Sequence, residues 1–365
     1  MEKSFFKPNF TVLDGIRGIA AFYVVLNHSR GHLLQGGSEF AAKKTVADWS
    51  LFEKIYYALL QFTTIGTEFV IVFFVLSGFS IAYSLRNSQK LGGFYLKRLI
   101  RLYPPYILAL IWAFVVFVLI DKFSPLLNKE GFSVFDNLEV TIKNLLYLNR
   151  GNFIPQFWSL IHEVFFYLLI PFALLRIRFY YIISVCLYLI GFFVPTSTIN
   201  SNILLLFLLQ YNIYFVIGVY LYRNYQFVSK YFRIRNTRLL IAALLVLFVA
   251  TIGVKFKTGG YGNLTFLLAS IGSILMIVNF QEKKIINPII KWLGEMSYTL
   301  YITHMASIYL FYLILVQLGL AQPTGKIETW WYWIASIPVT LLISHIYYII
   351  VEKRTKLFLI KIRKQ

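Results

Sequence analysis

Residues 64–85 read TIGTEFVIVFFVLSGFSIAYSL, an apolar run whose single formal charge is Glu68. About 20 apolar residues are enough for a helix to cross the ~30 Å hydrocarbon core of a bilayer. The run does not alternate apolar and polar residues, as a strand of an outer-membrane barrel does. It therefore predicts a transmembrane helix, and it decides the class of fold.

Similar runs occupy most of the remaining chain, and each is about long enough to span a bilayer. They cover residues 9–28, 99–120, 156–175, 179–195, 202–222, 238–254, 262–280, 293–318 and 330–351. The pattern predicts an all-α polytopic membrane bundle of about ten transmembrane helices. Residues 50–63 predict an interfacial helix. Because the spans and their loops use nearly the whole chain, we expect one membrane domain over residues 1–365 without an appended soluble domain.

The composition supports this class and indicates an orientation. The chain is 59% hydrophobic and only 14% charged, whereas soluble proteins carry about 25% charged residues. The net charge is +20, but the basic residues lie between the apolar runs rather than on one soluble face, which disfavours a nucleic-acid partner. Roughly two thirds of the Lys and Arg fall on one side of the expected membrane, which places both termini in the cytoplasm.

The first span carries two ionisable residues, Arg17 and His28. They are 11 positions apart, which is three helical turns plus about 20°, so they share one face and are separated by about 16 Å along the axis. Ionisable residues inside a membrane are costly and indicate function by default. The alternative is an arginine that reaches the interface and a histidine that ends the helix.

The third span begins with Arg98 and Arg101, which share a helix face at the cytoplasmic entry. Guanidinium groups suit phosphate recognition. From charge alone, ordinary topological anchoring is the favoured interpretation. Pro104 and Pro105 follow directly and predict a kink that opens space in the bundle.

The fourth span carries Glu163 about one to two turns from its expected outer end, at a depth similar to that of His28. A carboxylate at this depth is expected to face the bundle and to have a partner. It could orient an imidazole or a hydroxyl substrate, or form a purely structural ion pair. The adjacent His162 points about 100° away and receives no role.

The ninth span places Ser297, Tyr301 and His304 on one stripe, since they are spaced by four and three residues. His304 falls near the middle of the membrane, where a role in the site and an interhelical hydrogen bond are both reasonable. Ser77 and Gly78 in the second span indicate a small-residue packing site. His345 receives no role.

Some features limit the chemistry. Cys186 is the single cysteine and lies in an apolar run, so no intrachain disulfide forms. The sequence has no Gly-x-Ser-x-Gly elbow, phosphate loop, His-Glu-x-x-His or dinucleotide fingerprint. We therefore expect no metal and no tightly bound cofactor.

Five motifs in chain order resemble the type 3 membrane acyltransferases, which O-acylate bacterial surface glycans. They are Leu13-Asp14-Gly15-Ile16-Arg17-Gly18 with His28, Phe73-Phe74-Val75-Leu76-Ser77-Gly78-Phe79, Arg98-x-x-Arg101-Leu102-Tyr103-Pro104, Trp158-Ser159-Leu160-x-x-Glu163-x-x-Phe166-Tyr167, and Ser297-Tyr298-x-x-Tyr301-x-x-His304. The resemblance covers residues 10 to 350. Two positions depart from the family pattern. Ile71 stands where many relatives have a polar or acidic residue, which leaves open whether Glu68 substitutes, and His162 stands where apolar or small residues are commoner.

The resemblance implies an O-acyltransferase of the bacterial cytoplasmic (inner) membrane. Its donor would be cytoplasmic acyl-CoA carrying acetyl or a similar short acyl group, and its acceptor a hydroxyl of an extracytoplasmic or lipid-linked glycan. His28 and Glu163 would be catalytic, and Arg17, Arg98 and Arg101 would bind the donor. Asp14, Ser77, Tyr301 and His304 would support the site. The sequence leaves open whether His28 acts as a base or first accepts the acyl group, and whether the chain forms a homo-oligomer.

A transporter or flippase for a lipid-linked glycan is the competing class, because it too has polar residues inside a helical bundle. Such a protein is expected to have broken helices and an internal repeat. The sequence shows no repeat by inspection, which favours the enzyme.

Overall fold

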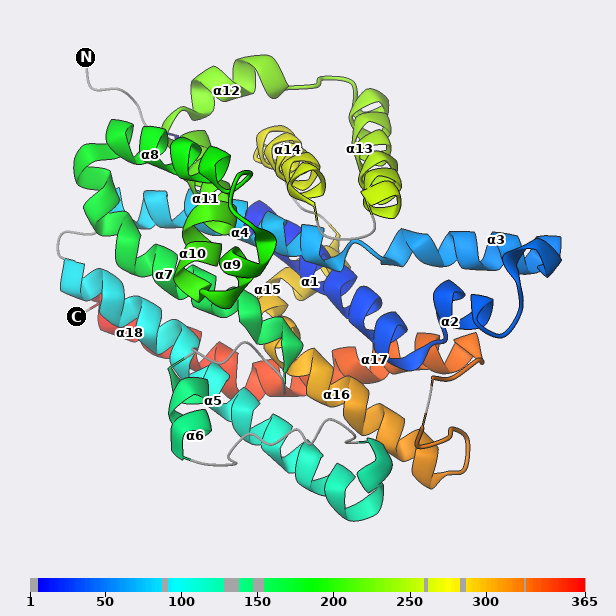
Figure 1. Ribbon diagram of the computed structural model, residues 1–365. Coiled ribbons are helices and arrows are strands. Elements are labelled where there is room, and N and C mark those ends of the chain that lie inside the picture. The colour runs from blue at the N-terminus through cyan, green and yellow to red at the C-terminus, as the bar shows by residue number, and fades with distance from the viewer. Residues whose placement is uncertain are drawn as a thin grey trace. The chain divides into compact units, whose positions relative to one another are not determined.

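The computed structural model describes residues 6–86, 91–127, 138–146, 154–258, 262–282, 287–324 and 326–364. Every regular element within these ranges is helical, and one isolated bridge joins Leu34 to Ile327 (Figure 1). The predicted all-α class is confirmed. Lys3, Lys90, Lys283 and Lys284, which contribute to the predicted orientation, lie outside the described residues.

The helices follow the apolar runs closely. In the first half of the chain they are α1 Phe10–Leu33, α2 Gly37–Ala41, α3 Leu51–Leu60, α4 Gly66–Arg86, α5 Leu91–Phe123, α6 Leu138–Leu145, α7 Trp158–Ala173 and α8 Ile177–Ile190. In the second half they are α9 Thr196–Ser201, α10 Ile203–Leu206, α11 Asn212–Arg223, α12 Tyr225–Phe232, α13 Thr237–Thr258, α14 Asn263–Phe280, α15 Pro288–Glu295, α16 Ser297–Gln317, α17 Trp330–Tyr347 and α18 Lys353–Lys364. Residues 50–63, predicted as an interfacial helix, contain α3, and its position at the interface stays a prediction.

Nine helical stretches in the described part of the chain are long and apolar enough to cross a membrane. The predicted fourth and fifth runs both overlap one of them, Pro155–Ile190. That stretch contains α7 and α8, which are separated by a 3₁₀ turn over Leu174–Arg176 and by non-helical backbone at Arg176. The difference between nine stretches and about ten predicted spans therefore lies at this turn.

The chain divides into two compact units. Unit 1 comprises Met1–Ala20, Thr67–Lys97 and Ser159–Glu295, and unit 2 comprises Ala21–Gly66, Arg98–Trp158 and Met296–Gln365. Helices α1 and α5 each contribute residues to both units.

In unit 1, α4 and α11 approach closely at a reciprocal pair of glycines. A Cβ atom on Gly78 would lie 2.0 Å from the carbonyl oxygen of Phe215, and one on Gly218 would lie 2.0 Å from that of Val75. Only hydrogen fits at either position. The interpretation of Gly78 as a small-residue packing site is thus confirmed, and its partner is Gly218.

A second glycine pair joins α1 to α15 in the same unit. A Cβ atom on Gly18 would lie 2.4 Å from the backbone nitrogen of Gly294. A Cβ atom on Gly294 would lie 2.6 Å from the backbone of Asp14. The two pairs together hold α1, α4, α11 and α15 by direct backbone contact.

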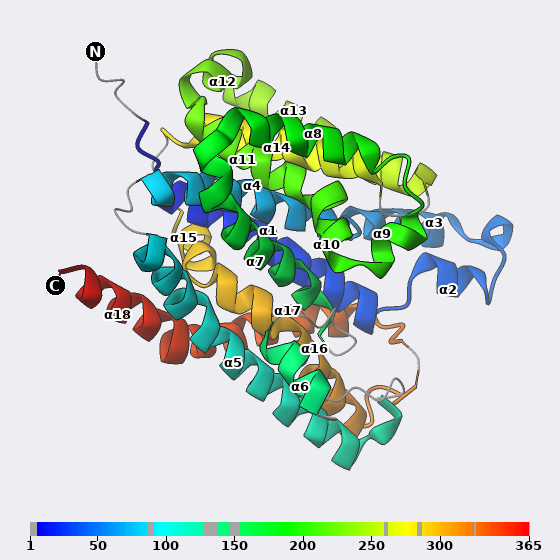
Figure 2. The same ribbon diagram turned by 60° about the vertical axis from the view of Figure 1, so that its left-hand side comes forward.

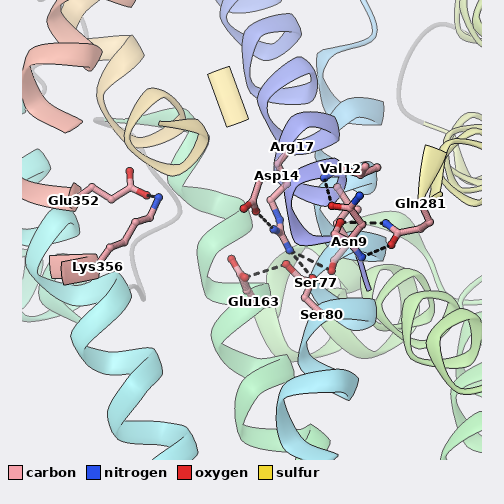
Figure 3. Close-up of polar contacts among 11 residues, drawn as sticks. Asn9, Val12, Asp14, Arg17, Ser77, Ser80, Glu163, Gln281, Glu352 and Lys356 are labelled. Carbon is pink, nitrogen blue, oxygen red and sulfur yellow. Dashed lines mark hydrogen bonds and ion pairs between the residues drawn. The ribbon is translucent and has the colours of Figure 1, made fainter. Parts of the chain in front are cut away.

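In unit 2, α16 is held at its first turn by a buried carboxylate. Glu352, which is 2% exposed, accepts hydrogen bonds from the backbone amide of Thr299 at 3.1 Å and from the Thr299 hydroxyl. A helix leaves its first amides without intrahelical partners, and an anion there is favoured by the helix dipole. Lys356 lies 2.8 Å from the same carboxylate and balances its charge (Figure 3).

Helix α5 continues through Pro104 and Pro105, so the predicted kink does not end the helix. Proline removes a backbone donor and frees a carbonyl one turn earlier. Nearby carbonyls of α5 accept hydrogen bonds from other helices of unit 2. The Tyr298 hydroxyl donates to Leu102 at 3.0 Å, and the Tyr347 hydroxyl donates to Pro105 at 2.8 Å.

Replacing Gly78 with Ala is expected to destabilise the protein by about 3 kcal/mol or more, because the methyl group overlaps a backbone oxygen that a side-chain rotation cannot move. Thermal unfolding of the purified protein in detergent measures the effect. Gly272→Ala is the matched control, since nothing lies within 4 Å of a Cβ there. The control should be neutral or stabilising by about 0.5–1 kcal/mol. Equal melting temperatures for the two variants would contradict the crossing at Gly78.

Candidate active site

His28 and His304 face each other in unit 2. Helix α1 carries His28 and helix α16 carries His304, and Nδ1 of His28 lies 2.9 Å from Nε2 of His304. The two rings stack with their centroids 5.1 Å apart. His304 is completely buried, whereas His28 remains partly accessible. The structure thus brings together two of the predicted site residues, which lie far apart in the sequence.

The hydrogen positions of this pair follow from the acceptors around it. Nδ1 of His304 lies 2.8 Å from the carbonyl oxygen of Tyr301 and 3.1 Å from that of Leu300. A carbonyl can only accept, so this nitrogen carries the proton. In a neutral ring Nε2 of His304 is then an acceptor, and Nδ1 of His28 must donate to it.

These hydrogen bonds determine the protonation state of the remaining nitrogen of His28, Nε2. With both rings neutral, Nε2 of His28 carries a lone pair and no proton. Two adjacent imidazolium ions would repel each other strongly, which disfavours a doubly protonated pair. The arrangement leaves one basic nitrogen on the accessible ring of His28, and the buried ring of His304 accepts the hydrogen bond from its other nitrogen.

Tyr301, the second residue of the predicted stripe, supports the turn that carries His304. Its hydroxyl donates to the backbone oxygen of Gln156 at 2.9 Å, and the Gln156 side chain donates to Ile302 at 3.4 Å. Both side chains are buried. His304 is therefore fixed by its own backbone and by the segment before α7.

A third histidine belongs to the same cluster. His32 lies one turn after His28 on α1, with ring centroids 6.3 Å apart, and its Nδ1 lies 3.4 Å from the Tyr309 hydroxyl. Sequence reasoning missed His32. Its spacing of four from His28 was the available signal, since residues at this spacing share a helix face.

Unit 1 holds a separate polar network around Arg17. The Arg17 guanidinium lies 2.7 Å from Asp14, donates to the Ser80 hydroxyl at 2.7 Å and reaches the Leu76 carbonyl at 3.4 Å (Figure 3). Asp14 thus supports Arg17, while Ser80 was not predicted. These contacts fix the guanidinium between α1 and α4.

Glu163 joins the same face of α4 from α7. The hydroxyl of Ser77 donates to the Glu163 carboxylate at 3.0 Å, and the Tyr167 hydroxyl also donates to it. Ser77 lies one turn of α4 from Ser80, the partner of Arg17, as Figure 3 shows. The carboxylate has partners, as expected for its position in a span. Its predicted association with His28 stays a prediction.

Arg98 and Arg101 lie on α5 in unit 2, and both are half-buried. Neither is a fully solvated anchor.

Of the histidines without a predicted role, His162 packs against Tyr211 at a centroid distance of 4.6 Å and His345 stacks on Tyr348 at 6.2 Å.

Two buried carboxylates escaped an assignment from sequence. Glu68 is 1% exposed and pairs with Lys255 of α13 at 3.0 Å in unit 1. Glu352 lies beside basic residues whose composition indicates a cytoplasmic anchor. The sequence therefore contains no signal that Glu352 would accept hydrogen bonds from the first turn of α16. Within the described ranges, no group of three or more His, Cys, Asp or Glu side chains is arranged to hold a metal ion.

Comparison with known proteins shows which family the chain is similar to. The model of the acyltransferase 3 family, described as an acyltransferase domain, matches residues 10–349. A curated relative, acyltransferase MdmB from Streptomyces mycarofaciens, is 32% identical over 168 residues. That match covers 44% of this chain and 38% of the relative. No solved structure matches the chain significantly.

We expect both His28 and His304 to carry their proton on Nδ1. Nitrogen-15 spectra of histidine-labelled full-length protein in detergent report this directly, and a His28→Gln variant assigns the His28 signals. In His304→Leu the acceptor is lost, so His28 should move toward the Nε2-protonated form that imidazole prefers in water. His345→Leu is the control and should leave His28 unchanged. A proton on Nε2 of His28 in the unmodified protein would contradict the assignment.

Proposed function

The chain belongs to the acyltransferase 3 family, and on that premise we propose a donor, an acceptor and a base for its reaction. It is an integral membrane acyltransferase. We propose that it moves a short acyl group, such as acetyl, from cytoplasmic acyl-CoA to a hydroxyl of an extracytoplasmic or lipid-linked glycan. The contact between His28 and His304 is the observation that carries the proposal.

His28 is the proposed general base. Its Nε2 lone pair removes the proton of the acceptor hydroxyl while the oxygen attacks the thioester carbonyl. The tetrahedral intermediate then collapses, the carbon–sulfur bond breaks, and the CoA thiolate takes the proton back from the His28 imidazolium. The products are an ester and free CoA thiol, and His28 returns to its starting state. Proton and leaving group therefore balance without a further reagent.

His304 is the proposed positioning residue for this base. By accepting the Nδ1 hydrogen of His28, it holds the ring in the tautomer that leaves Nε2 basic. When His28 becomes an imidazolium, the same hydrogen bond becomes charge-assisted and therefore stronger. A contact that strengthens as the reaction proceeds lowers the barrier.

Arginines are proposed to hold the anionic donor. Arg98 and Arg101 are half-buried neighbours on one face of α5, and their guanidinium forks suit the CoA phosphates. Arg17 is proposed to assist them, because its contacts with Asp14, Ser80 and Leu76 leave further N–H donors on the guanidinium. Acyl-CoA is a co-substrate in this scheme.

Glu163 is proposed to act on the acceptor or on the orientation of His28. Its carboxylate is held by Ser77 and Tyr167, so its position is fixed, and two oxygens provide further acceptor sites. A carboxylate of this kind can accept a hydrogen bond from a hydroxyl substrate.

His28→Ala is expected to lower turnover by roughly 10²–10⁴, the range for lost acid–base assistance. Transfer from radiolabelled acetyl-CoA to a glycan acceptor by purified protein measures it. His304→Leu should lower kcat by less and leave KM near normal, since it disturbs the tautomer and not the binding site. Turnover close to that of the unmodified protein in His28→Ala would remove His28 from the mechanism.

Glu163→Gln keeps the shape of the side chain and removes its charge. If Glu163 assists the reaction, turnover should fall by roughly 10²–10⁴ while CoA affinity is retained. Calorimetry with CoA and an activity assay on the same preparation give both quantities. Ser77→Ala is a useful companion, because it removes only one hydrogen bond to the carboxylate. A Glu163→Gln protein with a lowered melting temperature and normal turnover would show that the residue is structural.

A further inference from the structure

A cavity of about 520 Å³ lies in unit 1, and Arg17 and Glu163 are not among its lining residues. It lies where α4 and α7 end and where α11 passes into α12. The residues that line it include Arg86, Arg223, Asn224, Tyr225, Gln226 and Phe227. Its volume lies in the range of sites for small ligands.

The lining chemistry favours an anion. Arg86 at the end of α4 and Arg223 at the end of α11 bring two cations to one cavity from different helices. Two residues with amide side chains, Asn224 and Gln226, also line the cavity, and the described residues that line it include no Asp or Glu. Two guanidinium groups together with neutral donors form a site that suits phosphate.

The backbone adds donors to the same cavity. Asn224 precedes α12, but its side chain donates to the Tyr220 carbonyl at 3.1 Å and does not cap α12. The first amides of α12 belong to Tyr225, Gln226 and Phe227, which all line the cavity. Amides in a first turn have no intrahelical partner and favour a negative charge.

Aromatic residues close one wall of the cavity. Phe6 stacks on Tyr225 with ring centroids 3.5 Å apart, and Tyr225 donates from its hydroxyl to Val278. Figure 2 shows the N-terminal segment reaching this region beside α12. These contacts hold the segment from Phe6 against the start of α12, so the wall is built by packing.

The border of the cavity is apolar and exposed. Leu175, next to the lining residue Leu174, is 78% exposed, and Phe227 on the cavity wall is 59% exposed. In a membrane protein such side chains contact lipid tails. The predicted orientation places Arg86 and Arg223 on the cytoplasmic side, where the leaflet is rich in anionic lipids. A phosphate headgroup in the cavity would leave its acyl chains beside these apolar residues.

We propose that this cavity binds the phosphate headgroup of an anionic phospholipid of the cytoplasmic leaflet. The inference is independent of the proposed donor, acceptor and base. Phosphatidylglycerol is the probe, because it carries one phosphodiester with net negative charge. Phosphatidylcholine is its neutral counterpart with the same phosphodiester.

Native mass spectrometry of the full-length protein with each lipid tests the proposal. The unmodified protein should retain phosphatidylglycerol in preference to phosphatidylcholine. The variant Arg86→Gln/Arg223→Gln should lose about tenfold or more of that affinity, because it removes two charge-assisted contacts. Arg178→Gln/Arg235→Gln is the matched control: it removes the same charge from exposed residues that do not line the cavity, and should stay within about twofold. If the double cavity variant does not fold, the two single variants are measured in its place.

Several outcomes would overturn the proposal. Equal losses in the cavity and control variants would show general attraction of a basic surface for anionic lipid. Equal retention of the two lipids by the unmodified protein would remove the site. Binding of 3′,5′-ADP that depends on Arg86 and Arg223, without retention of phosphatidylglycerol, would assign the cavity to a nucleotide and overturn the lipid proposal without affecting the role of His28.

Discussion

The packing of the helices depends first on the close approach of their backbones at paired glycines. Helices in a bilayer gain no hydrophobic energy by leaving lipid for each other, so their association depends on tight packing and on hydrogen bonds. At Gly78 and Gly218 each helix leaves room only for a hydrogen atom on the other. Gly18 and Gly294 do the same for α1 and α15. Arg17 directly precedes Gly18 in α1. The backbone contact at Gly18 therefore also determines where the Arg17 guanidinium lies.

Once the helices are this close, their polar side chains can find partners without water. An ionisable group inside hydrocarbon is tolerated when it is paired, and three carboxylates of the described residues have a partner in their own unit. Glu68 pairs with Lys255, Glu352 with Lys356, and Glu163 accepts from Ser77. The contacts of Glu68 and Glu163 join different helices, whereas Glu352 and Lys356 lie one turn apart along the chain. Polar contacts between helices thus add to the backbone packing at the glycines.

This explains which parts of the molecule the sequence could predict. Hydropathy is a local property, so the helices were predictable, and the one disagreement in number arises at Arg176, where a short turn joins two apolar helices. Helical spacing also predicted that Tyr301 and His304 share a stripe. The partner of a polar residue is a long-range property. Spacing along one span could place Arg17 and His28 on a common face, but it could not show that His304 reaches His28. Glu352 was hidden because basic neighbours gave it the composition of a terminal anchor.

The hydrogen bond between His28 and a second histidine, His304, has a physical consequence for a base inside a membrane protein. In soluble triads a buried carboxylate orients the imidazole, but a carboxylate at that position would bury a charge in every resting state. A neutral His304 fixes the same tautomer while the pair carries no charge. On the proposed mechanism, charge develops only when His28 takes the acceptor proton, and it disappears when the thiolate takes the proton back. His304 itself cannot turn to pair elsewhere, since its Nδ1 is committed to the carbonyls of Leu300 and Tyr301. The first turns of α16 therefore determine which nitrogen of His28 is basic.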